Sequence, residues 1–139
     1  NDSIQYAIND SDLVVGSVYV VGKEAPKVVT KNMLASMNPG TVMVDVSIDQ
    51  GGCFESSRPT THDNPTFIEN DIVHYCVTNM PGAVPLTATQ ALNKVTLSYI
   101  EELANKGIDK ALDENEHLKN GLNIKNGTIT HSGVKEALE

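Results

Sequence analysis

The chain lacks long apolar runs, clusters of basic residues and repeats. None of its apolar segments approaches the ~20 residues that span a bilayer, so no membrane-spanning helix is expected. Ten Lys and Arg residues are scattered among eighteen Asp and Glu, which gives a net charge of −8. Nucleic acids and anionic membrane surfaces are bound by clustered basic side chains, so neither is an expected partner. What remains is a globular chain, 40% hydrophobic and long enough for one modest core.

Cysteine is equally scarce, and no leader peptide is recognisable at the start. Cys53 and Cys76 are the only two cysteines, and neither has the C-x-x-C spacing of a metal ligand. Residues 1–5 (NDSIQ) include no Met, basic segment or apolar segment, so they predict a fragment rather than a signal peptide. We therefore expect a cytoplasmic protein whose two thiols are buried and reduced. The sequence holds neither a Ser-His-Asp nucleophile arrangement nor a zinc-ligand pattern.

Three apolar segments predict the strands of a parallel sheet. Residues 13–21, 41–46 and 72–77 are rich in β-branched residues and do not alternate, which is typical of strands covered on both faces. A short helix with Thr30 as its N-cap is predicted between the first two segments. Its core-facing residues are Met33, Leu34 and Met37.

The remaining segments predict a long loop and then helices. Residues 47–71 show no convincing periodicity, and loops of that length are often functional. A long amphipathic helix is predicted from Thr87, which has capping-box spacing with Gln90, to Gly107. Further helices are predicted over residues 1–8, 108–115 and 132–139, with a hairpin at Asn126-Gly127.

Small, polar and glycine residues follow each of the three predicted strands. In an open parallel sheet, ligands bind outside the carboxyl ends of the strands. The segments there are Ser17-Val18-Tyr19, residues 47–52 (SIDQGG) and residues 78–82 (TNMPG). Glycines in two of these segments let a ligand approach the backbone closely. This edge of the sheet is therefore the predicted site.

Asp49 is the leading candidate at this edge. Its carboxylate, just past a buried strand and before two glycines, can orient water, accept a proton or bind a ribose. The alternative is a turn aspartate that caps nearby backbone N–H groups, and the residues leave both possibilities open. Asp45, within the strand, is expected to be structural. His62, His74 and Cys53 are weaker candidates, because a solvated or a buried structural role suits each of them.

Residues 44–55 (VDVSIDQGGCFE) and 57–61 (SRPTT) resemble motifs of the alanine dehydrogenases. Supporting blocks occur in the expected order at residues 22–27 (GKEAPK), 74–85 (HYCVTNMPGAVP) and 91–92 (AL). The resemblance covers the chain to about Gly107 and continues more loosely to the end. The related transhydrogenase components and lysine-pathway dehydrogenases share the sheet and a Gln-Gly-Gly-like turn, but are not expected to combine these motifs.

The resemblance implies reversible, NAD-dependent oxidative deamination of L-alanine to pyruvate and ammonium, in a two-domain hexamer without a metal. Residues 1–85 would form the C-terminal half of a Rossmann-type, parallel-sheet NAD-binding domain of the α/β class. Residues 86–139 would form a connecting helix and the C-terminal part of the substrate domain. Asp49 matches the family's catalytic aspartate. The residues implied to line the dinucleotide are Val18, Tyr19, Val46, Ser47, Ile48, Asp49, Val77, Thr78, Asn79 and Met80.

Several features of that family are missing from this sequence. It has no G-x-G-x-x-G motif, none of its four His residues matches the catalytic histidine, and the pyruvate-binding Arg and Lys are absent. We therefore expect this polypeptide alone neither to turn over alanine nor to bind NAD tightly. Half a Rossmann domain is also expected to self-associate through an exposed apolar edge. The alternatives are a non-catalytic oligomerisation or binding module that retains the fold, and the NAD-binding component of a transhydrogenase.

Overall fold

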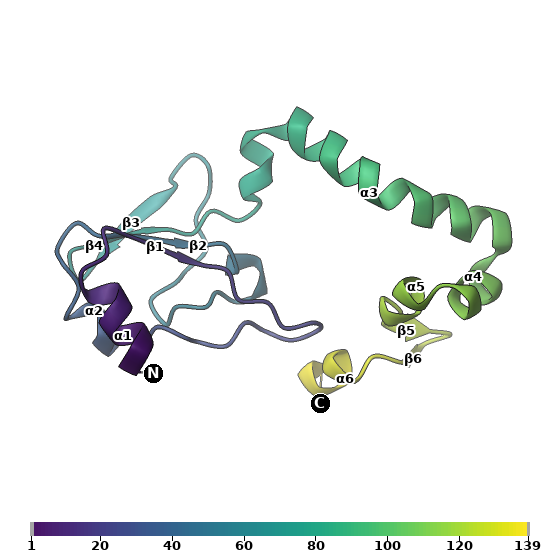
Figure 1. Ribbon diagram of the computed structural model, residues 1–139, viewed down its shortest axis with the longest axis horizontal. Helices are drawn as coiled ribbons and strands as arrows, with labels where there is room; N and C mark the ends of the chain where they lie inside the picture. Colours follow the sequence, from purple (N-terminus) through teal and green to yellow (C-terminus); the bar gives the residue numbers. More distant parts are fainter. Residues whose placement is uncertain (1, 139) are drawn as a thin grey trace. The chain divides into compact units, whose positions relative to one another are not determined.

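A four-stranded sheet organises the first 80 residues of the computed structural model, which describes residues 2–138 (Figure 1). The chain divides into a sheet unit (Asn1–Met80) and a helical unit (Pro81–Glu139). The sheet unit contains α1 (Asp2–Asn9), β1 (Leu13–Gly16), α2 (Lys31–Leu34), β2 (Val42–Asp45), the 3-10 helix η1 (Ile48–Gln50), β3 (Thr66–Glu69) and β4 (Ile72–Tyr75). After the 3-10 helix η2 (Met80–Ala83), the helical unit contains α3 (Pro85–Lys106), α4 (Ile108–Glu114), α5 (Glu116–Asn120), β5 (Ile124–Lys125), β6 (Thr128–Ile129) and α6 (Ser132–Leu138).

The strand order is β1-β2-β4-β3, in which β1, β2 and β4 are parallel and β3 is antiparallel to β4. The predicted parallel strands and the short helix before β2 are confirmed. The expectation of an unstructured loop over residues 47–71 is wrong in part, because β3 lies within it. Asn70 and Asp71 join β3 to β4 with φ values of 53° and 60°, as in a two-residue hairpin turn. A four-residue, half-exposed edge strand carries little apolar signal, so periodicity did not reveal it.

The core of the sheet unit lies on one face of the sheet. Helices α1 and α2 lie together on that side (Figure 1), and their buried side chains pack against Met43 and Ile72. The predicted burial of the α2 methionine and leucine side chains is confirmed. On the opposite face, Leu13 and Val15 are 58% and 57% exposed. The expectation of strands covered on both faces is therefore wrong for β1.

The start of α3 differs from its prediction. The helix begins at Pro85, which suits a first helical turn because its missing N–H would have no partner there. Thr87 lies inside the helix, so the predicted capping box is wrong. The predicted end at Gly107, the next helix, the Asn126-Gly127 hairpin and the last helix are confirmed. Helix α5 was not predicted; it begins after Asn115, whose side chain accepts two backbone N–H groups.

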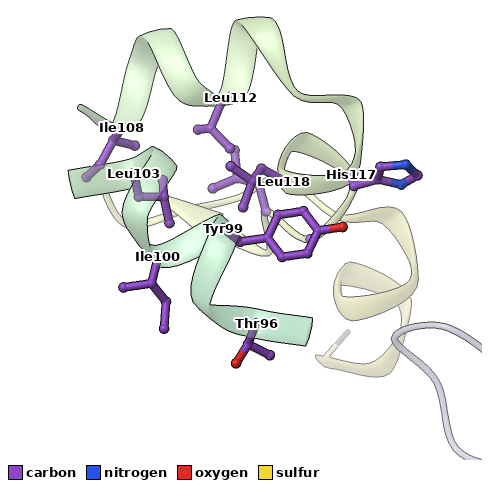
Figure 2. A pocket seen from close by; sticks show the side chains of 10 residues that line it. Thr96, Tyr99, Ile100, Leu103, Ile108, Leu112, His117 and Leu118 are labelled. Atoms are coloured by element: carbon purple, nitrogen blue, oxygen red, sulfur yellow. The ribbon is translucent and has the colours of Figure 1, made fainter. Parts of the chain in front are cut away.

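The apolar side of α3 is largely exposed. Leu92 and Val95 are 61% and 62% exposed. Near the end of α3, apolar side chains join those of α4 and α5 around a hollow of about 560 Å³ (Figure 2). Tyr99, Leu112 and Leu118 point toward one another there. Within residues 2–138, no helix combines the length and apolarity that a bilayer crossing requires.

Candidate functional site

The carboxyl ends of β1 and β2 are held together by Ser47. β1 is shorter than the predicted residues 13–21, because its last paired residue, Gly16, lies opposite Asp45, where β2 also ends. The chain then continues without a strand partner. Beyond this point the Ser47 hydroxyl links the two segments, because its Oγ accepts from the Val18 N–H at 2.8 Å and donates to the Val18 carbonyl at 2.8 Å. Two of the three segments predicted to line a ligand are thus brought side by side.

The third segment follows β4, which pairs with β2 in parallel and so ends at the same edge. Val77 is fully buried, and the Thr78 N–H donates to the Thr60 carbonyl at 3.2 Å. Asn79 is exposed and has a φ of 54°. His62, from the loop before β3, donates from Nε2 to the Asn79 carbonyl at 3.1 Å. The sequence did not reveal this link, because residues 62 and 79 share no local pattern.

The predicted lining residues divide into exposed and buried side chains. Tyr19, Val46, Asp49 and Asn79 are exposed, Val18, Thr78 and Met80 are half-buried, and Ser47, Ile48 and Val77 are buried. The three buried side chains lie inside the sheet unit and offer little surface to a ligand. The exposed and half-buried ones offer apolar surface beside a carboxylate and backbone polar groups. This combination fits a flat ring that carries polar substituents.

Asp49 lies in η1 with its carboxylate in solvent. Within residues 2–138 its side chain makes no hydrogen bond or ion pair, so the alternative of a turn-capping aspartate is wrong. The backbone of the turn is instead fixed by its own bonds, from the Gln50 N–H to the Ser47 carbonyl at 2.9 Å and from the Gly51 N–H to the Ile48 carbonyl at 3.1 Å. The carboxylate is therefore available to a ligand or a water molecule.

The carboxylate that caps the backbone N–H groups of this turn is that of Asp45. Its side chain is fully buried, and Oδ1 accepts from the Ser47 N–H at 3.0 Å. Oδ2 accepts from the N–H groups of Cys53 and Phe54 at 2.8 and 3.3 Å, and from the Ser57 hydroxyl at 2.5 Å. A buried carboxylate is tolerated only when such donors surround it. The position of Asp45 within an apolar strand is the sequence feature that indicates these hydrogen bonds. Its expected structural role is confirmed.

Lys27 holds the same turn from the other side. Its ammonium group donates to the carbonyl of Gly52 at 2.7 Å and also to the carbonyl of Gly51. Neighbouring backbone bonds run from Ala25 to Gln50 and from Val28 to Cys53, each 2.8 Å long. No local sequence pattern indicates this role of Lys27, because nothing near it distinguishes it from other exposed lysines.

A stack of side chains braces the loop behind the edge. The Arg58 guanidinium lies 4.1 Å from the centroid of the Phe67 ring, which stacks on His74 at 4.8 Å between centroids. His74 is fully buried; its Nδ1 donates to the Ile72 carbonyl at 3.1 Å, so Nε2 accepts from the Ser56 hydroxyl at 2.8 Å. His74 is therefore a core residue in its neutral form and not an acid–base group.

The sheet unit is expected to lose stability as the pH falls below 6.5. Burial is the largest effect and lowers the pKa of His74 from its usual 6.5. The Ile72 carbonyl and Glu69 raise this pKa in part, and the charges of Arg58, which lowers it, and Asp45, which raises it, have smaller effects. Below pH 6.5 the unfolded chain therefore binds a proton at His74 more readily than the folded chain does. The free energy of unfolding is highest above pH 6.5 and falls as the pH approaches the lowered pKa of His74. Urea unfolding between pH 5 and 7 measures it.

In that series, His74→Phe should flatten the pH dependence, and His62→Gln, a change at an exposed histidine, should preserve it. An equally steep dependence in His74→Phe would contradict the assignment.

Both cysteines are free and buried, as expected. Burial, followed by the charge of Asp45 and the hydrogen bond to it, raises the pKa of the Cys53 thiol to about 11. Burial also raises the pKa of Cys76. At pH 8 we therefore expect no reaction of the native chain with an aromatic disulfide reagent, and two reacting thiols in urea. Rapid labelling of the native chain would show that the turn beside Asp45 opens.

The site offers a carboxylate for acid–base chemistry and backbone polar groups for recognition. No group of three or more His, Cys, Asp or Glu side chains in residues 2–138 is arranged to hold a metal ion. What is present is an exposed carboxylate on a fixed turn, with apolar side chains and turn backbone beside it. Such an arrangement can orient a water molecule and take its proton next to a bound flat ring.

Comparisons with known proteins show which family the chain is similar to. A family model described as alanine dehydrogenase/PNT, C-terminal domain, matches residues 1–132. The chain is 52% identical over 136 residues to an alanine dehydrogenase from Halomonas elongata, covering 98% of this chain and 37% of that protein. It is 52% identical over 137 residues to an alanine dehydrogenase from Staphylococcus saprophyticus, again covering 98% and 37%. The chain thus spans little more than a third of the length of these curated relatives.

Solved structures also resemble the chain, among them the following two. An L-alanine dehydrogenase superposes with a TM-score of 0.78 at 45% identity, over 99% of this chain and 38% of that one. A transhydrogenase from Sinorhizobium meliloti superposes with a TM-score of 0.70 at 21% identity, over 94% of this chain and 35% of that one. The second likeness shows a shared fold. In the first, nearly half of the aligned residues are also identical.

Proposed function

Because the chain belongs to the alanine dehydrogenase/PNT C-terminal domain family, we propose that it supplies the C-terminal part of an NAD-dependent L-alanine dehydrogenase. The whole enzyme converts L-alanine, NAD⁺ and water to pyruvate, ammonium, NADH and a proton, and catalyses the reverse reaction. NAD, when bound, accepts the hydride. The observation that carries the proposal is the exposed Asp49 carboxylate on a turn fixed by backbone bonds at the end of β2.

The residues of this chain have separable roles in that proposal. Asp49 orients the attacking water and holds its proton. Val46, Val18 and Met80 supply the apolar surface against which a nicotinamide ring packs, and backbone groups beside Tyr19 and Asn79 meet its polar substituents. Residues 1–85 contribute half of the NAD-binding domain, and residues 86–139 the connecting helix and part of the substrate domain. The whole enzyme is proposed to be a cytoplasmic homo-oligomer, a hexamer by resemblance.

A graft tests this function directly. The whole chain replaces the 136 residues that it matches in the Halomonas elongata enzyme, and alanine-dependent NADH formation is measured. A graft of the matching Staphylococcus saprophyticus residues is the control for splicing. Activity of both grafts supports the proposal, whereas an active control beside an inactive graft of this chain overturns it.

The isolated chain is expected to show neither alanine turnover nor tight NAD binding, because the G-x-G-x-x-G loop and the catalytic histidine are not in its sequence. An NADH-coupled assay and a fluorescence titration with NADH measure both. Robust turnover by the 139 residues alone would show that they form a complete site of another kind.

A further inference from the structure

One peptide unit beside Asp49 is held by opposite charges at its two ends. The carbonyl of Gly52 accepts from the Lys27 ammonium at 2.7 Å, and the N–H of the same peptide, on Cys53, donates to Asp45 Oδ2 at 2.8 Å. The peptide dipole therefore points its negative end at a cation and its positive end at a buried carboxylate. Hydrogen bonds to charged groups are about twice as strong as neutral ones.

The buried carboxylate also closes the turn that carries Asp49. Oδ1 of Asp45 binds the N–H of Ser47, before η1, and Oδ2 binds the N–H of Cys53, after it. Residues 47 and 53 are thus fixed to one side chain, with Asp49 between them. Gly52 is required for this closure, since a Cβ there would lie 2.8 Å from Asp45 Oδ2.

Lys27 completes the arrangement from the surface. It is exposed, and its ammonium group binds two consecutive carbonyls of the turn, those of Gly51 and Gly52. The contrast is Lys31, four residues later, whose ammonium group pairs instead with Glu69 of β3 at 2.9 Å. Lys27 is therefore the lysine whose charge can be removed to loosen the turn while the buried network around Asp45 stays intact.

We propose that Lys27 and Asp45 are positioning residues for the dehydrogenase reaction, which fix the Asp49 carboxylate by holding the Gly52–Cys53 peptide between them. The proposal rests on the function proposed above. Displacing a reacting group by about 1 Å can cost about 100-fold in rate. Loosening this turn should therefore lower kcat, while the KM for L-alanine, set by residues outside this chain, changes little.

The test uses the active graft with Lys27→Met, which keeps the aliphatic stem and removes the charge, and Lys31→Met as the matched control. We expect Lys27→Met to lower kcat about tenfold or more with KM within about twofold, and Lys31→Met to leave both unchanged. In an Asp49→Asn background, Lys27→Met should cause no further loss, because it acts through Asp49. Wild-type kcat in Lys27→Met, or a full additional loss beside Asp49→Asn, overturns the proposal.

A second measurement separates this proposal from the proposed function. In the whole 139-residue chain, Lys27→Met should speed hydrogen exchange at the amide of Cys53, while the amides of β4 (Ile72–Tyr75) keep their rates. If the unmodified graft is inactive, the proposed function fails and this measurement still decides whether Lys27 holds the turn. Unchanged exchange at Cys53 would overturn the inference by itself.

Discussion

Asp49→Asn in the active graft is expected to lower kcat for alanine oxidation about 1,000-fold, within the range of about 10²–10⁴ that a positioned acid–base group contributes. Asparagine has nearly the shape of aspartate but carries no charge and accepts no proton at neutral pH. The side chain is exposed and makes no hydrogen bond within residues 2–138, so the fold loses nothing. The thermal midpoint should therefore stay unchanged, which separates a loss of chemistry from a loss of folded protein.

The control for this change is Asp63→Asn, an identical replacement at another exposed aspartate on the loop before β3. We expect it to leave kcat, KM and the thermal midpoint as they were. If Asp49→Asn kept more than a tenth of the activity, Asp49 would not be the proton-handling group. The site would then have to rely on a residue from outside this chain.

The edge of the sheet that carries Asp49 could be predicted because its signals are local. Each parallel strand ends where β-branched residues give way to glycine, serine and asparagine, and chain connectivity places these ends together. The choice between a free and a capping carboxylate could not be made from the sequence. That choice depends on which of Asp45 and Asp49 points toward the backbone of the turn. Asp45 does, because its position in β2 directs its side chain into the core.

Lys27 and His62 show why the rest could not be predicted. Lys27 reaches carbonyls 24 and 25 residues away, and His62 reaches one 17 residues away. A hydrogen bond to a backbone carbonyl cannot be predicted from the identity of the accepting residue, because every residue has a carbonyl. Asp45 is different, since a carboxylate inside an apolar strand is costly without partners and so indicates a buried hydrogen-bond network.

The exposed surfaces explain which fold predictions failed. β1 and α3 have the apolar residues of elements covered by neighbours, yet Val15 and Leu92 are 57% and 61% exposed. Within residues 2–138, neither unit by itself covers the apolar side of its own element, although the apolar pattern predicts such a covering. The predicted self-association follows from the same surfaces and can be measured by analytical ultracentrifugation.

Gly16→Ala is expected to destabilise the sheet unit by about 3 kcal/mol, the upper end of the usual cost of overpacking. A Cβ on Gly16 would lie 2.4 Å from the Cys53 sulfur and 2.5 Å from Cζ of Phe54. Both side chains are essentially unexposed, so neither can move aside without displacing the core. The backbone of Gly16 is that of an ordinary strand residue, and the cost is therefore steric rather than conformational.

Gly40→Ala is the matched comparison, because Gly40 has a φ of 86° and nothing within 4 Å of an added Cβ. It should cost only backbone strain, about 1 kcal/mol. Urea unfolding of both variants measures the difference. Equal costs would mean that the Phe54 ring yields to an added methyl group. The Phe54 N–H is one of the donors to Asp45, so a Phe54 ring that moves easily would leave the Asp49 turn less firmly held than the distances indicate. A larger cost for Gly16→Ala would instead show that the packing of β1 helps to fix the geometry of the site.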